Sequence, residues 1–189
     1  MTAAPTRREQ ILATAAELFA ARGFHGVSVT DIGAACGVSG PALYKHFASK
    51  DAVLAEMLVS ISEELLANGR ARSDGAPDAA TALAALVEHH LAFALGNRAL
   101  IVVQDRDWSS LPPEARERVR SLQRAYVDVW AARLRELDPR RTRDAARATA
   151  HAAFGLLNST PHSGLLDDEA MRALLRAMAH RALGLPAAA

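Results

Sequence analysis

Side chains able to donate hydrogen bonds to phosphates or nucleobases gather between residues 28 and 50. Hydroxyl, imidazole and ammonium groups can donate to phosphate oxygens, and such contacts set the register of a protein on duplex DNA. Lys45 can also donate to the acceptor edge of guanine, while a tip of small residues such as Gly40-Pro41-Ala42 offers shape and methyl contacts, for example to thymine. These residue types together indicate recognition of double-stranded DNA.

The predicted interface combines contacts to the DNA backbone with contacts to base edges. Arg7 and Arg8, which begin an earlier helix pattern, either reach a neighbouring phosphate or the minor groove, or remain an exposed charged helix tip. The expected backbone contacts are Thr30, Tyr44, His46 and Lys50, and the expected helix tip consists of Ser39, Gly40, Pro41, Ala42 and Lys45.

Two short helix patterns separated by a tight turn must position these groups. Ser28 and Asp31 have the spacing of a capping box, which starts the first helix. Gly37 stands where that helix must stop and the chain needs a positive φ, and Ser39 is placed to cap the second helix, with Pro41 in its first turn. This order is typical of a helix-turn-helix, whose second helix enters a DNA groove, and an ordinary helical hairpin is the alternative.

Residues 7–58 resemble the DNA-binding domain of TetR-type bacterial transcription regulators. The resemblance rests on Ser28-Val29-Thr30-Asp31-Ile32, on Gly37-Val38-Ser39, on Leu43-Tyr44-Lys45-His46-Phe47 and on Ser49-Lys50-Asp51. Departures include Thr30 at a position where a basic residue is common, and Gly33 and Cys36 where alanines are usual. The resemblance implies an all-α chain of about nine helices, with a three-helix DNA-binding head over residues 1–50 and a larger ligand-binding and dimerisation body over residues 51–189.

Composition fits a helical protein, since half of the residues are hydrophobic and only 5% are aromatic. A single cysteine cannot form an internal disulfide, which is typical of a reducing compartment. We find neither a signal-like leader nor an apolar stretch long enough to span a bilayer, so we expect a cytoplasmic protein without a membrane partner. Residues 1–50 carry five Lys or Arg against three Asp or Glu, a mildly basic balance suited to phosphate contact.

The rest of the chain has helical patterns. Residues 68–78 contain Gly69, Gly75 and Pro77, which predict a loop at the boundary of the body, and a helix is expected from Ala79 to Leu95. The last two helix patterns offer more apolar surface than two terminal helices need, which favours a homodimer formed through a four-helix bundle over simple burial within one chain. The expected dimer residues are Ala145, Ala148, Ala152, Phe154, Leu156, Leu174, Leu175 and Met178.

Polar and aromatic groups in apolar surroundings indicate a small-molecule pocket in the body. Each has a structural alternative: Tyr126 and Trp130 at helical spacing suit a core, and His151 suits a buried, hydrogen-bonded histidine. His89 and His90 are adjacent and point to different sides of a helix, so we expect neither a metal site nor a cofactor. The expected ligand-binding residues are Gln104, Trp108, Tyr126, Trp130, His151 and Asn158.

The segments VVQDRDWSSLPPEARERVRSLQRAYVDVW and FGLLNSTPHS are similar to actinobacterial TetR-type regulators associated with acyl-CoA and with fatty-acid or sterol breakdown. This resemblance implies a repressor released from an inverted-repeat operator by a small hydrophobic effector, an acyl-CoA or lipid-like molecule. The alternatives are an efflux regulator that responds to drugs or aromatics and, more remotely, an all-α enzyme or ligand carrier. We expect no enzyme, because the chain lacks a nucleophile elbow, a phosphate loop and a zinc signature.

Overall fold

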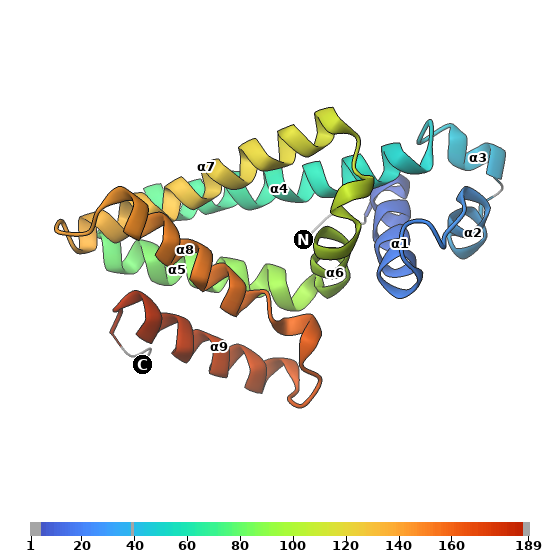
Figure 1. Cartoon of the computed structure of the whole chain (residues 1–189). Helices are drawn as coiled ribbons and strands as arrows, with labels where there is room; N and C mark the ends of the chain where they lie inside the picture. The colour runs from blue at the N-terminus through green and yellow to red at the C-terminus, as the bar shows by residue number, and fades with distance from the viewer. Residues whose placement is uncertain (1–4, 39, 187–189) are drawn as a thin grey trace. The chain divides into compact units, whose positions relative to one another are not determined.

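The computed structural model describes residues 5–38 and 40–186, which form helices joined by turns and loops and contain no strand. This confirms the expected all-α fold (Figure 1). Nine α-helices and two short 3-10 helices, at Trp108–Ser110 and Thr160–His162, lie in this part of the chain. The α-helices are α1 (Arg7–Arg22), α2 (Val29–Ala35), α3 (Gly40–Tyr44), α4 (Lys50–Asp74), α5 (Ala79–Gly96), α6 (Arg98–Asp107), α7 (Pro113–Leu137), α8 (Arg143–Leu157) and α9 (Asp168–Leu183).

The chain divides into two compact units. Unit 1 comprises residues 1–61 and 99–119, and unit 2 comprises residues 62–98 and 120–189, so α4 and α7 each contribute to both. Unit 1 is therefore larger than the head of residues 1–50 expected from the sequence. The reason is that Leu54 and Leu58 of α4 and Val103 of α6 are buried in the same core as Ile11 and Ile32.

Side-chain caps begin α1, α2 and α9, and the one at α2 is the capping box that the sequence predicts. Thr6 and Glu9 form a capping box at α1, and Ser28 and Asp31 form one at α2. The Asp167 side chain accepts from the amide of Ala170 at the start of α9. The turn after α2 places Gly37 at a φ of 68°, a conformation that favours glycine. The predicted cap at Ser39 lies outside the described residues.

The loop predicted for residues 68–78 is wrong, because α4 continues as a helix to Asp74. Gly69 lies inside this helix and is buried against α7. A Cβ added at Gly69 would lie 2.5 Å from Cε2 of Tyr126. The glycine therefore allows the tyrosine ring to pack closely on α4, and tertiary packing outweighs its poor helix propensity.

Unit 2 is built around α5. Eight of its residues are buried, and the helix packs against α8 and α9. By length and composition alone, Ala79–Gly96 is apolar enough to cross a membrane, so the expectation that no stretch reaches that length is wrong. Its apolar character reflects burial inside the fold, since the core helix of a globular protein passes the same test. The loop after α8 is tied to α5 by Thr160, whose hydroxyl donates to the Ala94 carbonyl oxygen at 2.7 Å.

Candidate nucleic-acid interface and a buried aromatic cluster

The helix α3 and the turn that follows it expose the side chains predicted to meet DNA. Leu43 and Phe47 are buried in the core of unit 1, at 1% and 4% exposure, and anchor this segment. Tyr44 is 56% exposed and Lys45 is also exposed, because they lie on the opposite side of the segment from these anchors. Thr30 is exposed at the first turn of α2.

The other predicted interface residues differ in how the structure places them. The helix α3 begins with Gly40 and Pro41, and Ala42 is half-buried within it. Ser39 lies outside the described residues. His46 is half-buried, and its backbone carbonyl accepts a hydrogen bond from within unit 1. Tyr44, Lys45 and Thr30 are therefore exposed enough to contact DNA. The assignment of each residue to DNA stays a prediction.

The start of α2 is held by a reciprocal cap. The amide of Ser28 donates to Asp31 Oδ2 at 2.7 Å, and the amide of Asp31 donates to Ser28 Oγ at 3.1 Å. Hydrogen bonds from the Ser28 side chain and backbone lower the pKa of the Asp31 carboxyl below its usual range. The cap fixes the first turn of α2, from which Thr30 projects.

The Lys50 side chain binds backbone groups within unit 1. Its ammonium donates to the carbonyl oxygens of Phe24 and Val27, each at 2.8 Å, and lies 4.3 Å from the centroid of the Phe24 ring. Two of its three N–H donors therefore hold the connection between α1 and α2. Its predicted contact with the DNA backbone would have to use the remaining donor.

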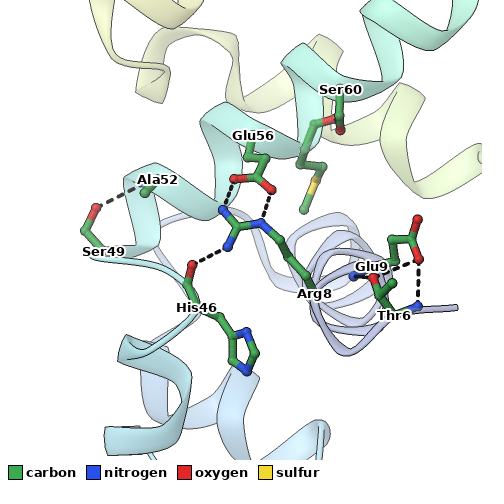
Figure 2. A network of polar contacts seen from close by, with 9 residues as sticks. Thr6, Arg8, Glu9, His46, Ser49, Ala52, Glu56 and Ser60 are labelled. Carbon is green, nitrogen blue, oxygen red and sulfur yellow. Dashed lines mark hydrogen bonds and ion pairs between the residues drawn. The ribbon is translucent and has the colours of Figure 1, made fainter.

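Arg8 joins three elements of unit 1, as Figure 2 shows. Its guanidinium pairs with both carboxylate oxygens of Glu56 on α4, donates to the His46 carbonyl oxygen at 2.6 Å, and lies over the Phe47 ring at 4.3 Å. The Arg8 side chain is exposed, as the expectation of an exposed charged helix tip has it, but it is also paired within unit 1, which the sequence did not predict. The physical reason is that α4 brings Glu56 back to α1 across 48 residues of sequence.

Arg7 also links two helices within unit 1. Its guanidinium donates to the Cys36 carbonyl oxygen at 2.5 Å and to Gln10 Oε1 at 3.0 Å. The side chain remains exposed. Arg7 thus ties the start of α1 to the end of α2, and the helix-turn-helix is held from the α1 side by two arginines.

Arg106 on α6 is a residue that sequence reasoning missed. Its guanidinium donates to the carbonyl oxygens of Phe19 and Ala20 at the C-terminal end of α1, the second at 3.0 Å. The side chain of its neighbour Asp107, 8% exposed, pairs with the same guanidinium and holds it in place. A cation at this position also faces the negative end of the α1 dipole. Sequence carried no signal for it, because the partners lie more than 80 residues away.

The predicted ligand-binding residues divide between the two units. Gln104 and Trp108 belong to unit 1, and the other four belong to unit 2. His151 is exposed, so the alternative of a buried histidine is wrong for this residue. Tyr126 and Trp130 are buried, at 5% and 0% exposure.

Tyr126 and Trp130 belong to a four-ring group that we call the aromatic cluster, together with His90 and Phe154. The Tyr126 and Phe154 rings are stacked with centroids 5.3 Å apart and planes 3° from parallel. His90 stacks on Phe154 at 4.9 Å, and Trp130 meets Phe154 edge-on at 5.0 Å. The sequence predicts Tyr126 and Trp130 as ligand-binding residues and Phe154 as a dimer residue, whereas His90 enters only as half of a metal pair that its adjacency to His89 excludes.

Polar atoms in the aromatic cluster are incompletely paired. His90 Nε2 lies 3.0 Å from Asn158 Oδ1, and burial lowers the pKa of His90 to about 4, so the imidazole is neutral at pH 7. Within the described part of the chain, His90 Nδ1, the Tyr126 hydroxyl and Trp130 Nε1 have no hydrogen-bond partner. Burial raises the pKa of the Tyr126 hydroxyl, and the interaction of this hydroxyl with the Trp130 indole N–H, which falls outside hydrogen-bonding geometry, opposes part of that rise.

Unit 2 also has an open surface cleft of about 430 Å³ between α4 and α7. Four of its charged side chains are paired: Arg133 binds Asp74 and Glu136, and Asp128 binds Arg147. The residues predicted to bind ligand do not line it. Among the described residues, no group of three His, Cys, Asp or Glu side chains is arranged to hold a metal ion.

The residues predicted for the dimer interface lie in several environments. Leu174 and Met178 on α9 are 44% and 39% exposed, and three alanines of α8 are also exposed. Leu175 is buried at 3% exposure and belongs to the core of the protomer. Phe154 is half-buried in the aromatic cluster, and Leu156 is half-buried on α8. The exposed alanines are Ala145, Ala148 and Ala152.

Two family models match separate parts of the chain. The model described as bacterial regulatory proteins, tetR family, matches residues 11–57. The model described as tetracyclin repressor-like, C-terminal domain, matches residues 76–162. The first covers α2, α3 and most of α1, and the second covers the helices that carry the aromatic cluster.

Individual proteins are similar over different lengths. The HTH-type transcriptional regulator UidR of Escherichia coli K12 is 35% identical over 102 residues, which are 53% of this chain and 51% of UidR. The HTH-type transcriptional repressor KstR2 of Rhodococcus jostii is 30% identical over 125 residues, 66% of this chain and 61% of KstR2. The matched region thus spans between about half and three fifths of these relatives. The crystal structure of the TetR-family regulator PfmR of Thermus thermophilus superposes with a TM-score of 0.83 at 28% identity, covering 98% of this chain and all of PfmR.

Proposed function

Because the chain belongs to the TetR family, we propose that it is a sequence-specific DNA-binding transcriptional regulator, a repressor that a small hydrophobic ligand releases from its operator. The observation that carries this proposal is the arrangement of α3. Buried Leu43 and Phe47 anchor the segment, and Tyr44 and Lys45 stand exposed beside them. Such an arrangement suits a recognition helix entering the major groove.

Contacts at the operator are proposed by residue type. Lys45 donates to guanine, and the tip formed by Gly40, Pro41 and Ala42 supplies shape and methyl contacts. Thr30 and Tyr44 donate from their hydroxyls to the DNA backbone. Arg8 and Lys50 support the interface from behind, since both hold backbone carbonyls of unit 1.

A homodimer on an inverted repeat completes the proposal. A recognition element of one short helix reads only a few base pairs, and a two-fold pair reads two half-sites about 34 Å apart. The exposed alanines of α8, with Leu174 and Met178 of α9, supply a small and apolar surface for a second copy. Such a regulator would act on cytoplasmic DNA.

The proposed effector is a hydrophobic small molecule, an acyl-CoA or another lipid-like compound. The support is the similarity of residues 102–130 and 154–163 to regulators of lipid breakdown, together with the aromatic cluster, to which these segments contribute Tyr126, Trp130 and Phe154. The alternative effector, a hydrophobic drug or aromatic compound of an efflux regulator, would find the same aromatic surroundings. Ligand binding would change the spacing of the two heads in the dimer.

The testing experiment is selection of operator DNA. Purified protein is mixed with fragmented genomic DNA from its source organism at near-physiological salt, and the bound fragments are sequenced. We expect an inverted repeat, and Lys45→Ala serves as the matched variant that should enrich it poorly. Recovery of unselected DNA alone would contradict the proposal. Titration of acyl-CoA thioesters of several chain lengths against the fluorescent operator then tests the lipid effector, and no release at any length would contradict that part.

A further inference from the structure

We propose that His90, Tyr126 and Trp130 form the polar recognition group of the effector site, and that the part of the effector bound there is an uncharged hydroxyl or carbonyl on an apolar skeleton. The inference rests on the proposed function, because it assigns the chemistry of the ligand that such a regulator senses. It adds His90, which sequence reasoning did not place there, and it leaves out His151, which is exposed.

The unpartnered atoms belong to rings that lie close together. The centroids of His90, Tyr126 and Trp130 are 5.9 to 6.2 Å apart, and each lies 4.9 to 5.3 Å from the Phe154 centroid. All three polar rings are more than nine-tenths buried. Among the described residues, each carries one polar atom without a hydrogen-bond partner. Buried polar groups are almost always paired in native proteins, so three in one cluster indicate a partner that the chain itself does not supply.

The hydrogen-bonding character of the three atoms defines the ligand. Trp130 Nε1 is a donor only, and the Tyr126 hydroxyl can donate and accept. With Asn158 Oδ1 as the acceptor 3.0 Å from His90 Nε2, that nitrogen carries the hydrogen and Nδ1 keeps a lone pair. The cluster thus offers two donors to a carbonyl or hydroxyl oxygen and one acceptor to a hydroxyl hydrogen.

Among the described residues, the aromatic cluster contains no positively charged side chain that could balance an anionic ligand. This argues against a carboxylate or phosphate in this position. His90 is neutral, and burial keeps the Tyr126 hydroxyl protonated. Arg72 acts on Tyr126 only through its charge, since its side chain is exposed and donates to the Asn68 carbonyl oxygen of its own helix. Desolvating an anion without a counter-charge is far more costly than desolvating a neutral oxygen.

Access to the aromatic cluster is from the side of Phe154. This ring is half-buried, whereas the other three are buried. The Tyr126 ring also packs against Gly69 of α4, where an added Cβ would lie 2.5 Å from Cε2 of the tyrosine. We therefore expect the Phe154 ring to move when a ligand enters, while Tyr126 stays against α4.

The Trp130 indole N–H reports directly on the proposed hydrogen bond. The full chain, labelled with ¹⁵N-tryptophan, gives two indole signals, and the spectrum of Trp108→Phe assigns the one from Trp130. The probes are 2-octanone, 1-octanol and octanoate, which share an apolar chain and differ in the oxygen group. We expect the ketone and the alcohol to move the Trp130 proton signal downfield in a saturable way, and octanoate to bind at least about tenfold more weakly.

Two variants separate hydrogen bonding from packing. Tyr126→Phe removes only the hydroxyl, and we expect it to weaken 2-octanone binding about two- to tenfold. Gly155→Ala adds a methyl group at an exposed position on the same helix as Phe154, where it meets nothing within 4 Å, and should leave binding unchanged. Thermal unfolding of each variant confirms that it is folded.

Three outcomes would overturn the inference. The first is a Trp130 signal that none of the probes moves, which is expected if a trapped water fills the position. The second is octanoate that binds as tightly as 2-octanone. The third is a Tyr126→Phe variant that binds 2-octanone as tightly as the wild type. The operator selection described above tests the regulator function separately. A responsive Trp130 in a protein that selects no operator would contradict the function and leave the site standing, and the reverse result would contradict only the site.

Discussion

The Lys50 ammonium lies 4.3 Å from the centroid of the Phe24 ring and 2.8 Å from the carbonyl oxygen of the same residue. A second bond of 2.8 Å reaches the Val27 carbonyl oxygen, so one side chain of α4 holds both ends of the short segment before α2. Since α2 begins two residues after Val27, this bond also places the helix that packs against α3. Lys50 therefore acts on the predicted DNA interface through the fold of unit 1.

Replacing Lys50 is expected to destabilise the protein. Lys50→Ala leaves two partly buried carbonyls without their donor and removes the cation over Phe24, at a cost of about 1–3 kcal/mol in the free energy of unfolding. Urea unfolding at pH 7 measures this change. Lys45→Ala, at an exposed position five residues away, is the matched control and should alter stability little. Equal stability of the two variants would show that the Phe24 and Val27 contacts contribute nothing.

Replacing Lys45 is expected to change DNA recognition. Lys45→Ala should weaken operator binding by about 1–3 kcal/mol and relax the base preference at one position of each half-site. Fluorescence anisotropy with the selected operator and with single-base variants of it makes the measurement. A uniform loss on all sequences would instead assign Lys45 to a phosphate, and no loss would remove it from the interface.

The Arg8–Glu56 pair should couple measurably although both side chains are partly exposed. In a double-mutant cycle with Arg8→Ala and Glu56→Ala, we expect an interaction free energy of about 0.5–1 kcal/mol, reduced by solvent screening. Arg8→Lys should recover little of it, because a lysine cannot hold the two carboxylate oxygens and the His46 carbonyl together. Additive single effects in urea unfolding would argue against the contact seen in Figure 2.

Two glycines should respond in opposite directions to alanine. Gly69→Ala forces a Cβ to within 2.5 Å of the Tyr126 ring and should destabilise the protein by about 1–3 kcal/mol despite better helix propensity. At Gly155 in α8, an added Cβ meets nothing within 4 Å, so Gly155→Ala should be neutral or stabilising by up to about 1 kcal/mol. Thermal unfolding of both variants tests the difference, and a stabilising Gly69→Ala would contradict the described packing of α4 on α7.

His90 should make stability depend on pH. Its pKa in the folded protein is about 4, against 6.5 for an ordinary histidine, so the unfolded chain binds the proton more readily. Stability from this residue is therefore complete above pH 6.5 and is lost as the pH falls from 6.5 toward 4, by about 3 kcal/mol in total.

The measurement is urea unfolding of the wild type and of His90→Gln at pH 7 and pH 4.5. The wild type should lose about 2–3 kcal/mol more than the variant across this interval, whatever the carboxylates contribute to both. Parallel losses would place His90 in contact with water.

Interactions between residues close in the sequence determine much of the local structure, so the sequence alone could predict that structure. The capping boxes at Thr6–Glu9 and Ser28–Asp31, and the positive φ of Gly37, depend only on neighbouring residues. The caps and the turn glycine indicated the helix-turn-helix, and the composition and helical patterns along the chain fitted the all-α fold that the family resemblance implied. These features are confirmed because their energetics are local.

Tertiary structure decided how the same side chains are used. Arg8, Lys50 and Arg106 find carbonyl or carboxylate partners 23 to 87 residues away, so their roles depend on how the helices pack. From the sequence, Gly69 predicted a loop. In the structure it lies inside α4, and the Tyr126 ring occupies the space that a side chain would need. The role proposed for His90 likewise depends on the packing of α5, α7 and α8, which brings four rings together. Burial and the lack of a hydrogen-bond partner for His90 Nδ1 among the described residues are properties of a packed core, so local sequence cannot predict them.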